Sequence, residues 1–172
     1  MDFQWSSEQR TLHKAVVDFA LQELNDDVEA RDQRSVFAHD LWRKCADYGV
    51  LSWAVPTELG GQGYDPLTTT YLMEALGYGC RDNGLTFALG AQMWGVQMAL
   101  THFASPDQIA QYLLPMMQGT SLAAYAITEP ASGSDAFALK TTAIKLGEHY
   151  VLNGEKTLIL SLIHISEPTR QY

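Results

Sequence analysis

Basic residues are scarce in this sequence of 172 residues. Eleven Lys and Arg stand against twenty Asp and Glu, which gives a formal net charge of −9 at pH 7. Neutralising the phosphates of DNA or RNA requires clustered Lys and Arg side chains. The composition therefore excludes nucleic acid as an expected partner.

Cysteine is also scarce. Cys45 and Cys80 are the two cysteines of the sequence, and they have neither C-x-x-C spacing nor a nearby set of His and Cys residues. We expect two reduced thiols that pack in the core or on helix faces, with no disulfide and no metal site.

Long apolar runs are missing. Even the most apolar region, residues 83–103, is interrupted by polar side chains, so we expect no membrane-spanning helix. The first five residues lack a basic segment followed by an apolar core, so no secretory signal is expected either. These two absences make the cytoplasm the expected location.

The length and the hydrophobic content of 47% fit one domain with a sizeable core, or one domain and part of a second. Apolar residues recur at three- and four-residue spacing up to about residue 118, which predicts amphipathic helices. The expected helices cover about residues 8–25, 37–48, 66–76, 83–103 and 109–117.

Past residue 120 the pattern changes to that of strands. Residues 124–128 predict a strand that is at least half buried, which Pro130 would end because proline cannot donate to a sheet ladder. Residues 131–135 predict a tight turn whose N–H groups and hydroxyls can hold an anion such as a phosphate. The alternative is a solvated turn without a ligand.

The following residues predict a β-hairpin. Residues 141–146 alternate as in a strand, residues 147–149 suit a turn, and residues 150–152 pair back. Asn153-Gly154 is a second strong turn signal, and a further strand is expected over residues 156–159.

The order of residues in Tyr125-Ala126-Ile127-Thr128-Glu129-Pro130-Ala131-Ser132-Gly133-Ser134-Asp135 resembles the flavin-binding signature of acyl-CoA dehydrogenases. Three further segments resemble this family in the expected order: the glycine-rich loop 56–63, the run 105–119 and the stretch 152–159. The matches have departures, because Ala104 stands where glycine is usual, Leu114 looks inserted, and Leu158 takes an aromatic position.

The resemblance implies an α+β chain. Residues 1–120 would form the N-terminal all-α helical domain, and residues 121–159 the first strands of a truncated, β-barrel-like middle domain. Residues 160–172 do not continue the family pattern and resemble a translated sequencing adapter, so we expect this tail to be an artefact. His164 and Glu167 lie in it and are given no role.

The family resemblance implies an FAD-dependent oxidoreductase of fatty acid and lipid metabolism that desaturates an acyl-CoA thioester between Cα and Cβ. Ser134 would also lie near the pantetheine part of the substrate. The flavin-binding residues carried over from the matched signature are Tyr125, Ala126, Ile127, Thr128, Gly133 and Ser134.

The catalytic base of such enzymes is a carboxylate from a later helical domain, so no catalytic residue is assigned here, and Glu129 is expected to be structural. We expect this fragment to be inactive alone, and to bind FAD weakly or not at all. The resemblance also implies an electron-transferring flavoprotein as partner and a homo-oligomer at full length. The alternatives are an acyl-CoA oxidase or flavin monooxygenase of the same fold, and a non-catalytic helical interaction module.

Overall fold

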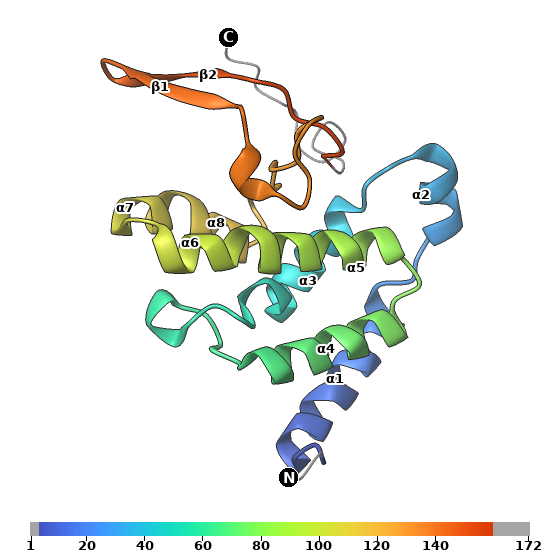
Figure 1. Cartoon of the computed structure of the whole chain (residues 1–172). Coiled ribbons are helices and arrows are strands. Elements are labelled where there is room, and N and C mark those ends of the chain that lie inside the picture. Colours follow the sequence, from blue (N-terminus) through green and yellow to red (C-terminus); the bar gives the residue numbers. More distant parts are fainter. Residues whose placement is uncertain (1–3, 160–172) are drawn as a thin grey trace. The chain divides into compact units, whose positions relative to one another are not determined.

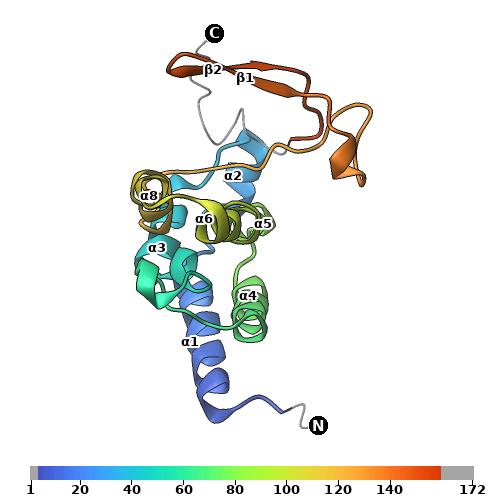
Figure 2. The same cartoon turned by 60° about the vertical axis from the view of Figure 1, so that its left-hand side comes forward.

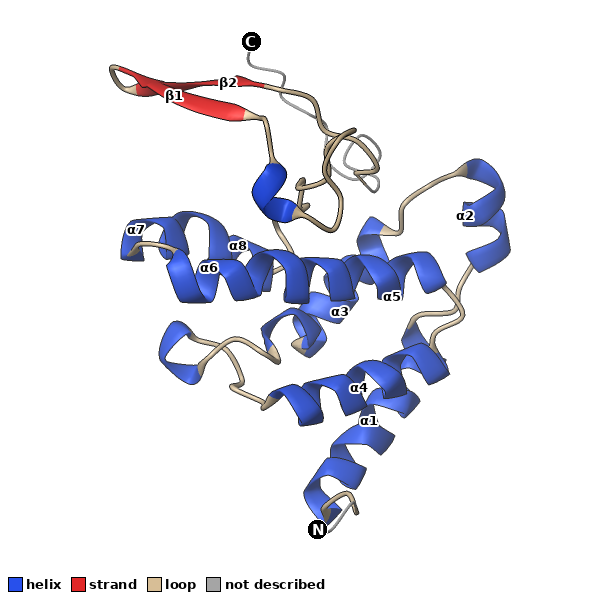
Figure 3. Cartoon of the chain, viewed as in Figure 1, coloured by secondary structure: helices blue, strands red, loops and turns tan. Residues whose placement is uncertain are grey.

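The computed structural model describes residues 4–159, which belong to two units that divide between Ala123 and Ala124. The first unit is helical and the second holds the strands (Figure 3). The expected boundary at residues 120 and 121 stays a prediction, and the expected artefact at residues 160–172 lies outside the described residues.

Ten helical segments make up most of the first unit, two of them π-helical (η3 and η4). They are α1 (Ser7–Glu23), α2 (Val28–Arg34), α3 (His39–Tyr48), α4 (Pro66–Gly79), α5 (Asn83–Gly90), η3 (Ala91–Gln97), α6 (Met98–Phe103), α7 (Pro106–Gln108), η4 (Ile109–Leu113) and α8 (Leu114–Met117) (Figure 1). Two short 3-10 turns, η1 (Val50–Ser52) and η2 (Thr57–Leu59), lie between α3 and α4.

Helices α1 and α4 lie side by side (Figures 1 and 2). Ser6 begins α1 with a capping box, because its side chain accepts from the Gln9 amide while the Gln9 side chain accepts from the Ser6 amide. A Cβ atom at Gly79 would lie 2.7 Å from the Cβ atom of Ala20, so a glycine is needed where the two helices touch.

The core of this unit is built from the apolar faces of α1, α3, α4 and α5, as the amphipathic pattern predicted. Cys45 and Cys80 are buried free thiols within it. Burial, with a smaller effect of the nearby Cys80, raises the pKa of the Cys45 thiol to about 12. A thiol of such a high pKa stays protonated and unreactive at neutral pH.

The glycine-rich loop before α4 turns back on the chain. The Gly63 amide donates to the Val55 carbonyl at 2.9 Å, and the Tyr64 amide donates to the Trp53 carbonyl at 2.9 Å. A Cβ atom at Gly61 would lie 2.0 Å from the Val55 carbonyl oxygen. The glycines therefore permit a close approach of two backbone segments.

The single helix expected over residues 83–103 is confirmed as the continuous run α5, η3 and α6, with a wider π-helical stretch in its middle. Gln92 lies in this stretch and is buried. Its Oε1 atom accepts from the Ala123 amide at 2.9 Å, and its Nε2 atom donates to the Met116 carbonyl at 3.4 Å. The helix is thus joined to the end of the first unit.

The second unit contains a 3-10 turn, η5 (Ala136–Ala138), and an antiparallel hairpin of β1 (Thr142–Leu146) and β2 (His149–Asn153). The register runs from the pair Thr142 and Asn153 to the pair Leu146 and His149. The predicted hairpin is confirmed, and every residue of both strands is exposed.

Two predicted strands are wrong. Residues 124–128 and 156–159 form no strand, and Asn153-Gly154 does not connect two paired strands. The two segments meet through one backbone hydrogen bond, from the Thr157 amide to the Thr128 carbonyl at 2.9 Å. A strand needs a continuous ladder with a neighbour, and local sequence preference cannot supply the neighbour.

Among residues 4–159, no helix is long and apolar enough to cross a membrane.

Candidate functional site

The predicted flavin segment, residues 125–128, is an extended stretch of backbone with open hydrogen-bonding groups. Tyr125 and Ala126 are exposed, and Ile127 and Thr128 are half-buried. Within the described part of the chain, the four N–H groups of this segment have no hydrogen-bond partner. The Thr128 hydroxyl has none there either, so five donors are available on a short stretch.

The turn after this segment is closed by its own backbone. The amides and carbonyls of Glu129 and Ser132 bond to each other, at 2.9 Å and 3.1 Å. Gly133 and Ser134 lie on the exposed side, and a Cβ atom at Gly133 would meet nothing within 4 Å. The predicted tight turn is present, and its surface around Gly133 is open to a ligand.

Glu129 is buried beneath the same turn, and the residue as a whole is 6% exposed. Its Oε2 atom accepts from the Lys140 amide at 2.7 Å, and its Oε1 atom accepts from the Thr141 amide at 3.0 Å. The Lys156 ammonium donates to Oε1 at 2.9 Å. These contacts agree with the structural role expected for Glu129.

The surroundings of Glu129 favour its charged form. The neighbouring Thr141 hydroxyl, the Lys140 amide and the Lys156 ammonium together lower the pKa of Glu129 from its usual 4.5 to about 2. The Thr141 hydroxyl oxygen lies buried beside the carboxylate, with no well-formed hydrogen bond to any described residue. Glu129 is therefore ionised at neutral pH.

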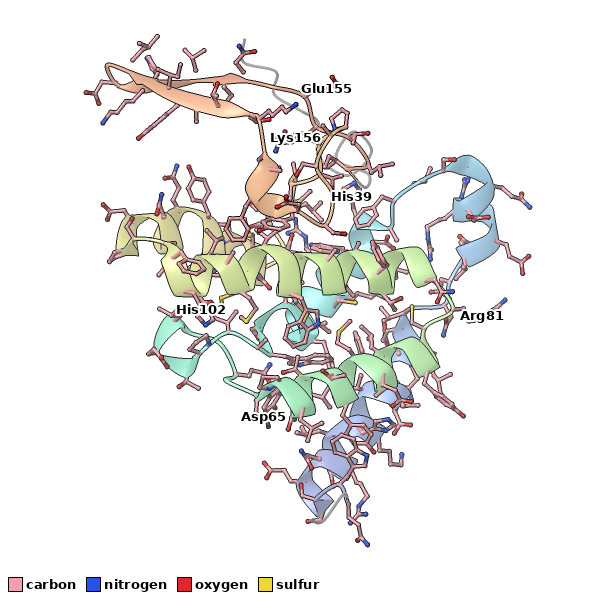
Figure 4. All side chains as sticks on the ribbon, in the orientation of Figure 1. His39, Asp65, Arg81, His102, Glu155 and Lys156 are labelled. Atoms are coloured by element: carbon pink, nitrogen blue, oxygen red, sulfur yellow. The ribbon has the colours of Figure 1, made fainter. Side chains whose placement is uncertain are left out.

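Lys156, whose side chain is labelled in Figure 4, connects two of the segments that carry the family resemblance. Its Nζ atom donates to the Ile127 carbonyl at 2.9 Å as well as to Glu129. The sequence pattern did not predict this contact, although Glu129 and Lys156 are charges of opposite sign in the segments 125–135 and 152–159. That pair of charges is the signal that could have revealed it.

The chemistry of these groups fits a flavin dinucleotide. A flavin ring offers carbonyl and nitrogen acceptors, and its pyrophosphate accepts from N–H groups and hydroxyls. The open N–H groups of residues 125–128 and the exposed Gly133 and Ser134 are donors of the required kind. The role of each of these residues stays a prediction.

The helical unit has a separate pocket of about 610 Å³, and no predicted site residue lines it. Trp42 is among its lining residues, and the buried Nε1 atom of Trp42 has no hydrogen-bond partner among the described residues. Charged side chains of both signs, including Arg43 and Asp47, also line it.

Comparison with known proteins gives the family. Residues 6–120 match the family model described as acyl-CoA dehydrogenase, N-terminal domain. The L-prolyl-[peptidyl-carrier protein] dehydrogenase of Serratia sp. (strain ATCC 39006) is 35% identical over 92% of this chain and 41% of its own length.

Solved structures agree with this result. The prolyl acyl carrier protein oxidase AnaB is 44% identical, with a TM-score of 0.81 over 89% of this chain and 40% of its own. The structure named "PigA with FAD and proline" is 35% identical, with a TM-score of 0.85 over 92% of this chain and 42% of its own. The chain thus spans about two fifths of the length of these relatives, and it belongs to the acyl-CoA dehydrogenase family, whose N-terminal domain it contains.

Proposed function

We propose that the chain is the N-terminal part of an FAD-dependent dehydrogenase that oxidises the acyl group of a thioester between Cα and Cβ. The observation that carries this proposal is the open donor segment 125–128, held in place by Glu129 and Lys156 within a chain of this family. The structural neighbour that contains FAD supports the same cofactor here.

In this proposal the chain's own residues bind and orient. The backbone of residues 125–128 and the Thr128 hydroxyl donate to the flavin ring, and Gly133 and Ser134 lie near the pyrophosphate. Ser134 also lies near the pantetheine part of the substrate. When bound, FAD supplies the hydride acceptor that no side chain can provide.

The catalytic base is not Glu129. A general base works best when its pKa lies near the working pH, whereas the pKa of Glu129 is about 2 and its oxygens are already bonded. We infer that a carboxylate from a later helical domain removes the α proton, and that this 172-residue chain alone does not complete the reaction.

The proposal includes two classes of thioester substrate. The family model supports an acyl-CoA substrate. Relatives named for an electron-transferring flavoprotein and for a caffeyl-CoA reductase-Etf complex support such a flavoprotein as the electron acceptor. A homo-oligomer at full length is proposed from the family resemblance alone. The relatives named for prolyl carrier proteins favour a second candidate, a prolyl group held as a thioester on a carrier protein. The relative named an oxidase also favours O2 as an alternative electron acceptor.

The test is to sequence the parent gene beyond the codon for Ile159, express the full reading frame and record its flavin absorbance. Anaerobic bleaching by acyl-CoA thioesters would support the first substrate class, and bleaching by a prolyl carrier protein the second. Oxygen consumption during turnover would identify an oxidase. A purified protein without flavin would contradict the proposal and favour the non-catalytic helical module.

A further inference from the structure

Glu129 and Lys156 form a partly buried ion pair that the reaction itself does not use. The side chain of Glu129 is 5% exposed and that of Lys156 is 27% exposed, and their charged atoms lie 2.9 Å apart. A partly buried ion pair is weak support for stability, because taking charge out of water costs free energy. We therefore looked for the role of the pair in the groups that it holds in place.

The carboxylate is the fixed end of this pair. Two backbone amides, of Lys140 and Thr141, donate to it, and the backbone of Glu129 itself is bonded in both directions to Ser132. Because Glu129 is held at its backbone and at both carboxylate oxygens, it fixes the place of the Lys156 ammonium.

The ammonium in turn fixes one peptide group. Lys156 Nζ donates to the Ile127 carbonyl at 2.9 Å, and the described chain contains no cis peptide bond. The carbonyl and the N–H of a trans peptide group point in opposite directions. Holding the Ile127 carbonyl toward Lys156 therefore directs the Thr128 N–H away from it, and that N–H has no partner among the described residues.

The positive charge also changes the strength of this donor. A cation bonded to a carbonyl polarises the whole peptide group, which makes its N–H a better hydrogen-bond donor. The adjacent peptide group is held as well, because the Thr157 amide donates to the Thr128 carbonyl at 2.9 Å. The open N–H of Thr128 is thus both oriented and strengthened.

We propose that Glu129 and Lys156 are positioning residues that aim the Thr128 amide at an acceptor atom of the flavin ring without touching the flavin themselves. This inference rests on the proposed function, since it takes the flavin as the ligand of residues 125–128. It assigns to the two charged side chains the orientation of a donor, beyond the structural role expected from the sequence.

The first experiment needs no flavin. In isotope-labelled NMR spectra of the 172-residue chain, Lys156→Met should shift the Ile127 carbonyl and Thr128 amide signals and leave those of β1 and β2 in place. Lys145→Met, an exposed change of the same kind on β1, is the matched control. Unchanged Ile127 and Thr128 signals in Lys156→Met would overturn the proposal.

The second experiment uses the full reading frame of the parent gene and measures FAD affinity by flavin fluorescence. Loss of one charge-assisted hydrogen bond predicts about tenfold weaker binding for Lys156→Met. Lys156→Arg should restore most of the affinity, and Lys145→Met should leave it unchanged. Glu129→Gln keeps Lys156 but loosens its position, so it should give an intermediate loss of FAD affinity. This variant tests the proposal even if Lys156→Met fails to fold.

The outcomes separate the two proposals. Equal FAD affinity for wild type, Lys156→Met and Glu129→Gln would overturn the positioning role and leave the proposed function intact. A wild-type protein that binds no FAD would overturn the proposed function, and the positioning role with it.

Discussion

The two units of the chain bury different kinds of side chain. In the helical unit the fully buried side chains are mainly large and apolar, among them Trp42, Leu72 and Leu76. In the described part of the second unit, the buried residues are Glu129 and Ser132, and both strands are exposed along their whole length. One unit is organised around an apolar core, and the other around a buried carboxylate.

This difference predicts different responses to change. Burial of apolar surface contributes roughly 25 cal/mol per Å², so the helical unit depends on how well its core is filled. A two-stranded hairpin is marginally stable at best in water, so the second unit depends on a few directed polar contacts. Substitutions in one unit should therefore leave the other nearly unchanged.

The largest effect is expected from Leu76→Ala on α4. Leu76 is fully buried, and the cavity left by the leucine should lower the free energy of unfolding of the helical unit by about 2–5 kcal/mol. Urea denaturation followed by far-UV circular dichroism would measure it. Leu21→Ala, at a residue 55% exposed on α1, should stay within about 0.5 kcal/mol. Equal losses in the two variants would contradict the assigned core.

A smaller loss is expected from Gly79→Ala, where α1 and α4 touch. The added methyl group would lie 2.7 Å from the Cβ atom of Ala20 and 2.8 Å from the Val17 carbonyl oxygen, so overpacking should cost about 1–3 kcal/mol. Gly77→Ala on the same helix is the matched control, because its Cβ atom would meet nothing within 4 Å. The control should gain up to about 1 kcal/mol in the same denaturation measurement. A gain in both variants would refute the close helix contact.

Glu129→Gln should act on the second unit alone. Loss of the carboxylate charge weakens the bonds from the Lys140 and Thr141 amides and from Lys156. We expect several-fold faster hydrogen exchange at these two amides, with unchanged helical circular dichroism. Glu155→Gln is the control, since Glu155 is exposed and has no partner among residues 4–159 (Figure 4). A change of the helical signal would break the separation between the units.

The smallest effect is expected from a change of pH, because Glu129 stays ionised near neutral pH and is protonated only in strong acid. The folded-state pKa of Glu129, about 2, lies below its usual 4.5, so its contribution to stability is complete above 4.5 and is lost as the pH falls toward 2. NMR signals of the Thr141 amide should therefore titrate near pH 2 and stay constant between pH 5 and 7. A midpoint near 4.5 would show that the carboxylate is not held as described.

The sequence by itself determined most of the helical unit, because amphipathic spacing and caps act over a few residues. Ser6 and Gln9 begin α1 as a capping box, and the run 83–103 is one continuous helical stretch. The hairpin of β1 and β2 was also predicted, since its turn and alternating strands are local in sequence. The resemblance of residues 125–135, taken together with those of residues 56–63, 105–119 and 152–159, gave the family, and the family model over residues 6–120 confirms it.

Only the tertiary structure decided how the segments of the second unit meet. The sequence predicted strands over residues 124–128 and 156–159, but a strand depends on its neighbour, and these segments share one backbone bond. The contacts of Lys156 with Glu129 and the Ile127 carbonyl join residues 27 and 29 positions apart. No local pattern encodes such a contact, because its geometry depends on the path of the whole chain between the two ends.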